Sequence, residues 1–266
     1  MIYFETGATY ANTTKALIAY DSYVDSINVT ATDLNALNDY TFDYWKANSS
    51  GSITFDINIG SEYAKKTTNY LAIAAHNLSE SLNDNPGTDA FKLQYYNGSS
   101  WADAAKLDQS DITDNSPLII HFADTQAQKW RLVMDSAFQY VRLGVVKLGK
   151  ILEMQRTVYK SADNVPLSRD ETTIPQRSES GQFLGMVMTR QFNVGSIQWN
   201  HLTYQWYRDN FDPFAVRSAL HPFFIAWRPS DFPGECVFAW RRNNIKPANT
   251  GPRGMMSVSL DMEGIA

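Results

Sequence analysis

The feature that most constrains the fold of this chain is a series of short apolar runs separated by turn residues. In the run SITFDINIG, apolar side chains alternate with polar ones at Ile53, Phe55, Ile57 and Ile59. A period of two is typical of a strand with one buried face. Similar runs recur between residues 70 and 149: YLAIAAHNL, FKLQYY, PLIIHF, WRLVM and YVRLGVVKLG. Many short strands with Asn-, Asp-, Gly- and Ser-rich turns between them predict a β-sandwich or jelly roll.

A polar stretch divides the chain near residues 158–182. It carries Pro166 and Pro175 and few large apolar side chains, which is typical of a linker or an extended arm. Net charge also differs on its two sides, at −7 for residues 1–155 and +2 for residues 156–266. We therefore expect three parts: a β-sandwich over 1–157, a linker or arm over 158–182, and a β-rich assembly domain over 183–266.

The second half is expected to be α+β with a majority of strand. A short helical region is predicted near 199–220, and Asp212 followed by Pro213 fits an N-cap and first turn, which suggests two helices. Four aromatic residues at helical spacing are expected to form one buried stripe: Tyr204, Tyr207, Phe211 and Phe214. Closing strands are predicted at Phe223–Trp227, Val237–Trp240 and Met256–Met262. The predicted fold class is thus mainly β.

Composition narrows the class of protein. A chain that is 44% hydrophobic and 19% charged forms a packed core. Its net charge of −5 argues against nucleic acid as a partner. Cys236, the single cysteine, has no intramolecular partner for a disulfide. The start of the chain lacks the pattern of a signal peptide, and no apolar run is long enough to span a membrane, so we expect synthesis in the cytoplasm and no membrane insertion.

No catalytic motif is present in the sequence. There is no G-x-S-x-G nucleophile elbow, and the four histidines have no zinc-ligand spacing: His76, His121, His201 and His221. We therefore expect no enzymatic activity and no cofactor.

Structural calcium is a weak alternative to that expectation. Asp108, Asp111 and Asp114 recur at every third residue and could supply oxygen ligands. A second group of such ligands comprises Asn83, Asp84, Asn85 and Asp89. Asx-turns are the simpler explanation of both clusters.

The first half resembles a discoidin or galactose-binding-like domain. The residues that carry the resemblance are, in order, Ser52–Asn58, Tyr70–Ser79, Tyr95–Gly98 with Trp101, Lys129–Leu132 and Val141–Met154. The match spans about residues 30–155 and implies a galactose-binding-like β-sandwich. It also implies glycan recognition, with Tyr95, Tyr96 and Trp101 as the expected contacts. Because Tyr95 and Tyr96 are neighbours in a strand, one should face the core and the other solvent.

The second half resembles the ends of tail-tip and baseplate proteins of tailed bacteriophages. The residues that carry this resemblance are Trp206–Asp209, His221–Phe224 with Trp227, Val237–Trp240 and Ser257–Ile265. The resemblance implies a structural subunit of the virion tail that forms a ring with copies of itself and contacts the tail tube, hub or tape-measure region. The alternative is an adhesion module that binds host surface glycans.

Four arginines are expected at the assembly interface: Arg208, Arg228, Arg241 and Arg242. Arginine suits the rim of a protein contact, and Arg241 and Arg242 at a strand end could meet an acidic partner surface. A solvated surface is the other interpretation of the four residues.

Overall fold

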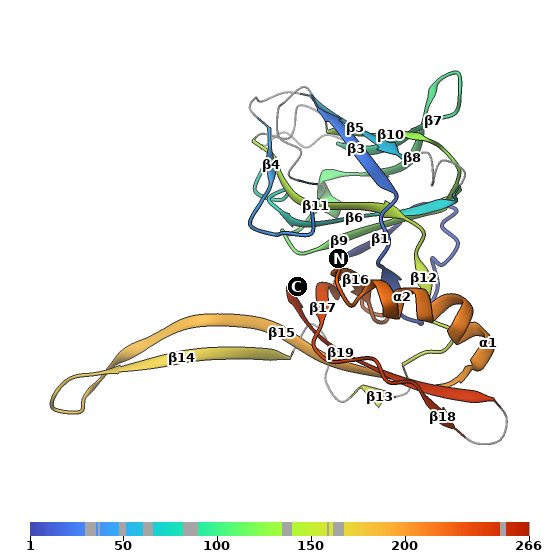
Figure 1. Ribbon diagram of the computed structural model, residues 1–266. Coiled ribbons are helices and arrows are strands. Elements are labelled where there is room, and N and C mark those ends of the chain that lie inside the picture. The colour runs from blue at the N-terminus through green and yellow to red at the C-terminus, as the bar shows by residue number, and fades with distance from the viewer. Residues whose placement is uncertain are drawn as a thin grey trace.

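The computed structural model describes residues 1–29, 36, 38–47, 52–60, 66–81, 90–134, 140–158, 160–161, 168–250 and 254–265. Two five-stranded sheets lie face to face above a third, larger sheet, and one helical segment lies against the third sheet (Figure 1). A two-stranded arm extends from the third sheet, away from the rest of the molecule. The expected fold class is confirmed, since the chain is mainly β with a β-sandwich in its first half.

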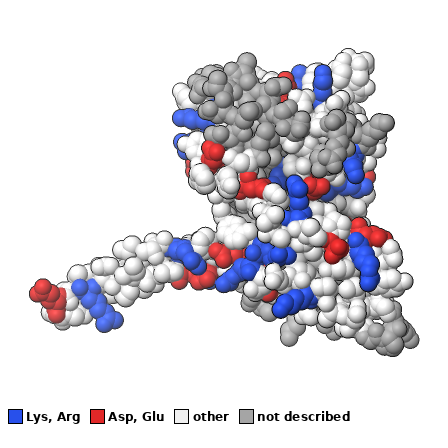
Figure 2. All heavy atoms as spheres, in the orientation of Figure 1, with Lys and Arg blue, Asp and Glu red and all other residues white. Residues whose placement is uncertain are grey.

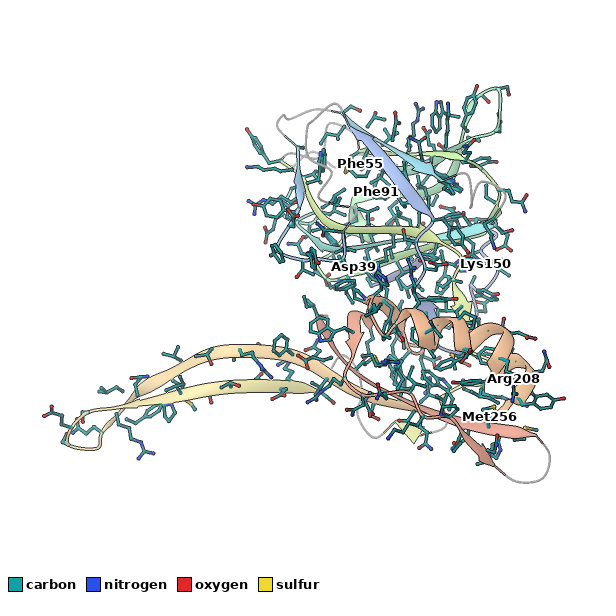
Figure 3. The ribbon with its side chains drawn as sticks, viewed as in Figure 1. Asp39, Phe55, Phe91, Lys150, Arg208 and Met256 are labelled. Atoms are coloured by element: carbon teal, nitrogen blue, oxygen red, sulfur yellow. The ribbon has the colours of Figure 1, made fainter. Side chains whose placement is uncertain are left out.

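The first two sheets form the sandwich. One sheet contains, in spatial order, β1 (Ile2–Phe4), β9 (Leu118–Thr125), β6 (Thr68–His76), β11 (Arg142–Gly149) and β4 (Trp45–Lys46). The other contains β3 (Val24–Val29), β5 (Ile53–Ile59), β10 (Lys129–Met134), β7 (Phe91–Tyr96) and β8 (Trp101–Leu107), followed by the short turn η2 (Gln109–Asp111). Figure 3 shows Phe55 and Phe91 between these sheets, and both side chains are fully buried in their common core.

The third sheet completes the fold. Its order is β12 (Leu152–Glu153), β2 (Leu17–Ala19), β16 (Phe223–Ala226), β17 (Cys236–Arg241), β19 (Met255–Ile265), β15 (Phe183–Thr203) and β13 (Lys160–Ser161). Two further strands pair at its edges, β14 (Arg169–Arg177) with β15 and β18 (Ala248–Thr250) with β19. Because β2 and β12 precede residue 157, this sheet draws strands from both sides of the expected domain boundary.

Strand β6 lies between two cores. Its residues from Thr68 to Ala74 are all buried, whereas β5 alternates between buried and more exposed positions. Leu71 and Ile73 pack into the sandwich, while Tyr70, Ala72 and Ala74 pack toward the third sheet against residues such as Phe224 and Phe238. A strand covered on both faces reads as a continuous apolar run, which explains the YLAIAA segment. The two halves of the chain are therefore joined by a shared apolar layer.

The helical region is shorter than predicted. Trp199–Thr203 belongs to β15 and pairs with β19 across a bulge, and His201 takes a positive φ of 59° there. The helical segment is continuous and consists of α1 (Tyr204–Trp206), η3 (Tyr207–Phe211) and α2 (Asp212–Arg217). The predicted break and N-cap at Asp212 are wrong, because Asp212 is itself helical and its N–H donates to the Tyr207 carbonyl five residues earlier. This π-turn precedes Pro213, whose ring and missing N–H disturb a regular α-helix.

Three of the four predicted stripe residues are buried. Tyr207, Phe211 and Phe214 pack between the helical segment and the third sheet, where the rings of Phe214 and Phe223 meet edge to face at 5.0 Å. Tyr204 is instead half exposed and stacks beside Arg208. The stripe thus begins one turn later than the sequence suggested. In the part of the chain that the structure describes, no helix is both long and apolar enough to cross a membrane.

His76, at the end of β6, makes the fold sensitive to acid. Its Nε2–H donates to the Ser116 carbonyl at 2.9 Å, and its Nδ1 accepts from the Leu78 N–H at 3.3 Å. Burial lowers the pKa of this imidazole to about 4. The unfolded chain binds the proton near pH 6.5, so stability falls as the pH drops from about 6.5 to about 4, by about 3 kcal/mol.

We expect His76→Gln to flatten this part of the stability curve. Urea unfolding at a series of pH values between 4 and 7 measures it, as the difference between the curves of the native chain and the variant. Parallel curves would show that His76 does not bind the proton differently in the folded and unfolded states.

Candidate functional site

The arm is a two-stranded ribbon made of β14 and the first half of β15. Residues 169–177 pair with residues 183–193 in antiparallel register, and a turn over Ser178–Gln182 closes the tip. The pairing of β15 with β19 begins only at Asn193. Beyond that point no other described strand pairs with the ribbon, and it extends away from the rest of the molecule (Figure 1).

Large apolar side chains are exposed along the arm. Six of them have exposed fractions between 47% and 67%: Ile174, Phe183, Leu184, Met186, Val187 and Met188. Figure 2 shows an uncharged middle section, with charged side chains gathered at the tip and toward the base. Surface patches of this kind mark interaction sites in soluble proteins.

Apolar residues lie on both faces of the arm. Val187 is directly opposite Ile174, while Met186 and Met188 occupy the alternate positions of the same strand and point to the other face. An isolated two-stranded ribbon is only marginally stable in water, and its outer strand edges carry unpaired backbone groups that can bind another chain. The arm thus has the features of a segment that another molecule covers.

Sequence reasoning identified the arm only in part. The predicted linker over 158–182 includes β14 and the tip, while residues 162–167 lie outside the described part of the chain. The apolar run after it, FLGMVM, was expected to be part of the second module, but it lies in the arm, and Phe183 is 66% exposed. The sequence did contain an indication of this exposure. The strand that pairs with the run, RDETTIPQR, is polar, so the two strands do not form an apolar core between them.

A second candidate surface is the outer face of the sheet that contains β7, β8 and β10. Arg131 donates through Nε to Gln94 Oε1 at 2.7 Å, and Gln94 donates through Nε2 to Asp103 Oδ1 at 2.5 Å. The Arg131 guanidinium lies 4.3 Å from the centre of the Trp101 ring. Tyr96 lies beside Trp101 at 5.4 Å. We call these five residues the aromatic face.

Burial raises the pKa of Asp103, but hydrogen bonds from Gln94 and Lys106 outweigh this effect, so the pKa is lowered. Asp103 therefore stays ionised at neutral pH. The aromatic face combines two partly exposed ring systems with a fixed row of hydrogen-bond donors and acceptors, as polyhydroxylated ligands require.

Two of the three expected glycan contacts share this face. Tyr96 and Trp101 are opposite each other across the β7–β8 hairpin, whose turn at Asn97 and Gly98 has a φ of 102° at the glycine. Tyr95 points to the interior and packs near Trp130. Because consecutive side chains of a strand point to opposite faces, Tyr95 and Tyr96 lie on different sides of the sheet.

The four expected interface arginines are dispersed. Arg208 donates to the Tyr204 carbonyl at 3.0 Å, and Arg241 donates to the Ala215 carbonyl at 3.1 Å. Arg228 pairs with Asp231 beside the stacked rings of Trp227 and Phe232, and Arg242 lies 3.7 Å from Glu263. Each therefore already has an intramolecular partner, and the structure does not gather them into one patch.

The three residues named as a weak calcium alternative, Asp108, Asp111 and Asp114, do not form a metal site. Asp111 accepts a bond from the Asp108 N–H at 2.8 Å, and Asp114 accepts bonds from Ser116. Among the described residues, no group of three or more His, Cys, Asp or Glu side chains is placed to hold a metal ion. The second cluster, Asn83, Asp84, Asn85 and Asp89, lies outside the described residues.

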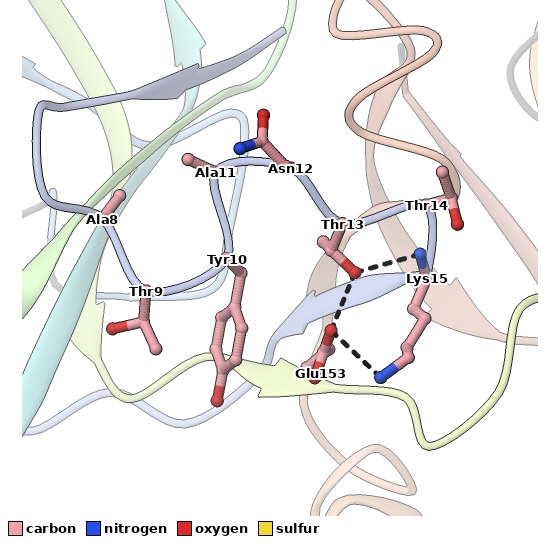
Figure 4. A pocket seen from close by; sticks show the side chains of 9 residues that line it. All are labelled: Ala8, Thr9, Tyr10, Ala11, Asn12, Thr13, Thr14, Lys15 and Glu153. Atoms are coloured by element: carbon pink, nitrogen blue, oxygen red, sulfur yellow. Dashed lines mark hydrogen bonds and ion pairs between the residues drawn. The ribbon is translucent and has the colours of Figure 1, made fainter.

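A polar pocket lies where the sandwich meets the third sheet. Residues 8–15 form most of its wall, together with Glu153 of β12 (Figure 4). The Thr13 hydroxyl donates to Glu153 at 2.7 Å, and the Lys15 ammonium lies 3.4 Å from the same carboxylate. These contacts bind the N-terminal segment to β12, so the pocket is explained by the packing of the two halves.

No protein-family model and no curated protein sequence matches the chain. Among solved structures, a pectin-binding carbohydrate-binding module is similar, with 13% identity, 49% of this chain and 93% of that chain covered, and a TM-score of 0.36. A chitosan-binding module from Paenibacillus sp. IK-5 has 13% identity, coverage of 53% and 98%, and a TM-score of 0.32. A Clostridium perfringens module in complex with GalNAc-β-1,3-galactose has 11% identity, coverage of 51% and 94%, and a TM-score of 0.34. At these scores the comparison assigns no ligand and no role to this chain.

Proposed function

We propose that the chain is a structural subunit that assembles with copies of itself through the β14–β15 arm, in the tail tip or baseplate of a tailed bacteriophage. The observation that supports assembly is the arm itself, with six large apolar side chains exposed on a ribbon outside the core. The proposed action is binding rather than catalysis. Repeated contacts between an arm and a different surface of the next copy generate a closed ring when the rotation between neighbouring copies closes.

The placement in a tail rests on the resemblance of the C-terminal segments described above. On this proposal the subunit is made in the bacterial cytoplasm and becomes part of the virion. The arm would engage neighbouring copies. The sandwich, which lies over one face of the third sheet and apart from the arm (Figure 1), would be available to a peripheral tail protein.

Sedimentation velocity of the full chain at micromolar concentration tests the assembly proposal. We expect a discrete multi-copy species whose population grows with concentration. A single monomeric species across the whole concentration range, in the presence and absence of salt, would contradict the proposal.

Glycan recognition by the sandwich is a second candidate, supported by the aromatic face. Tyr96 and Trp101 present ring surface, and Gln94, Asp103 and Arg131 present fixed polar groups next to it. Sugars bind where apolar ring faces meet directed hydrogen bonds. This function is compatible with assembly, because the arm and the aromatic face belong to different sheets.

If the aromatic face binds a glycan, Trp101→Ala should weaken binding about fivefold or more, because a stacked ring contributes about 1 kcal/mol or more. Tyr204→Ala is the matched control, since it removes a half-exposed aromatic ring from the other module. A glycan array identifies the ligand, and titration of both variants measures affinity. Equal affinities of the two variants, or an array without signal, would exclude this face as a glycan site.

A further inference from the structure

A polar pocket lies beside the aromatic face, on the same sheet of the sandwich. Five residues from three strands line it: Asp56, Asn58, Trp101, Lys129 and Trp130. Its volume is about 330 Å³, near the lower end of the range of about 300–1,000 Å³ for small-molecule sites. A pocket of this size has room for one sugar ring. Trp101 belongs both to the pocket and to the aromatic face, so the two are continuous.

Strand geometry gathers the polar side chains of the pocket on the outer face of the sheet. In β5 the apolar residues are buried, and Asp56 and Asn58 are half-buried on the other face. In β10 Lys129 is exposed next to the buried Trp130. Antiparallel pairing sets Asn58 opposite Lys129 and Asp56 opposite Arg131. These four polar side chains therefore form a compact group on two neighbouring strands.

The Trp101 ring borders this group from the side of β8. It reaches over β7 to β10, since the Arg131 guanidinium lies 4.3 Å from the centre of the ring. Arg131 is fixed in turn by its hydrogen bond to Gln94 at 2.7 Å. An indole held in this way loses little side-chain entropy when a ligand covers it. The pocket thus places an apolar ring beside polar groups, which suits the C–H face and the hydroxyl groups of a sugar.

The two charged groups that line the pocket are available to a ligand. Within the described part of the chain, neither the Asp56 carboxylate nor the Lys129 ammonium forms a hydrogen bond or an ion pair. They are diagonal neighbours on adjacent strands, and such positions lie about 7–8 Å apart. Because Asp56 is half-buried, its carboxylate has lost part of its hydration, and a hydroxyl donor from a ligand can replace it.

We propose that this pocket binds one neutral pyranose unit of a glycan. The inference rests on the glycan recognition proposed above for the sandwich, and it adds a site and a class of sugar. A sugar hydroxyl can donate to the Asp56 carboxylate and accept from the Lys129 ammonium. A sugar carboxylate would instead be repelled by Asp56, and the ammonium of an amino sugar by Lys129. The opposite signs of the two groups therefore select against charged sugars.

Saturation-transfer difference NMR on the full chain tests the inference, because the method detects weak binding to large particles. The probes are the methyl glycosides of glucose, glucuronic acid and glucosamine, and the corresponding three in the galactose series. We expect transfer to a neutral glycoside and weaker binding of its charged counterparts. Asp56→Ala should weaken binding of the neutral glycoside about tenfold or more, because hydrogen bonds to charged groups are the stronger ones. The matched control is Asp209→Ala, which removes an exposed carboxylate from the helical segment.

Lys129→Ala is the second variant and should also weaken binding, and its exposed side chain can be removed without disturbing the core. Transfer that is lost in Trp101→Ala but unchanged in Asp56→Ala and Lys129→Ala would overturn the pocket and leave glycan recognition by the aromatic face standing. Binding of a charged glycoside as tight as that of its neutral counterpart would overturn the class of sugar. Absence of transfer to every probe would overturn the inference, and an empty glycan array as well would overturn glycan recognition by the sandwich.

Discussion

Under the proposed self-assembly, deletion of the arm should leave a folded monomer. The deletion can be made cleanly, because the Val194 N–H donates to the Ser168 carbonyl at 3.0 Å. Residues 169–193 can therefore be replaced by Asn-Gly, which closes antiparallel strands in a two-residue turn. The arm packs on no core of its own, so the thermal unfolding temperature should change little.

A finer variant tests the apolar contribution of the arm. Phe183→Ser, Leu184→Ser and Met186→Ser together should weaken association at least about 100-fold, since each buried side chain of this size contributes about 1.5–3 kcal/mol. Thr172→Ser with Thr173→Ser, on the opposite strand, is the matched control and should assemble normally. Sedimentation and circular dichroism measure the two properties separately. A deletion variant that still assembles would show that the arm is not the contact.

Removal of Asp39 should be the most destabilising single change at the junction of the two modules. Lys147 is 5% exposed, and its ammonium is bound by Asp39 and by the Pro222 carbonyl. Burial lowers the pKa of Lys147, an effect that Asp39 opposes. A buried charge that loses its partner typically costs about 3–5 kcal/mol, so we expect a loss of that size for Asp39→Ala in urea unfolding.

A second substitution distinguishes loss of the ion pair from general damage. Lys147→Met in the Asp39→Ala background removes the unpaired charge and should recover most of the lost stability, because apolar replacements of buried pairs are often neutral. If the double variant were as unstable as Asp39→Ala alone, the cost would come from the loop rather than from the buried ammonium.

The pH dependence of this cluster has a definite sign. Burial raises the pKa of Asp39, but Lys147 and His221 outweigh it, so the pKa is lowered. A lowered carboxyl pKa contributes stability that is present above the ordinary value and is lost as the pH falls through the folded value. We therefore expect the fold to become less stable in acid for two reasons: protonation of His76 in the sandwich and protonation of Asp39 at the junction.

The sequence predicted the strands better than their arrangement. Alternation at Ile53, Phe55, Ile57 and Ile59 identified a half-buried strand, because side-chain period follows directly from backbone geometry. The continuous run in β6 gave no information on which two layers cover it. That Leu17–Ala19 and Phe223–Ala226 would share a sheet depends on pairing over some 200 residues, which no local pattern specifies.

The same holds for the candidate sites: local patterns predicted individual strands, but not the contacts between distant segments. The alternation of side chains along a strand separated Tyr95 from Tyr96, because this period is local. The pairing of Tyr96 with Trp101 depends instead on a four-residue loop over residues 97–100. The exposure of Phe183 and Leu184 could not be read from their own residues, since an apolar alternating run is normally buried. It depends on the polar partner strand and on the absence of a third strand beside it. The junction of the two halves depends on the contact between Asp39 and His221, which are distant in sequence.

Electron cryo-microscopy of the assembled full-length chain tests the central claim most directly. We predict a closed particle in which each β14–β15 arm lies against a neighbouring copy, with Met186 and Met188 covered. A particle whose arms project into solvent while other surfaces form the contacts would contradict this account.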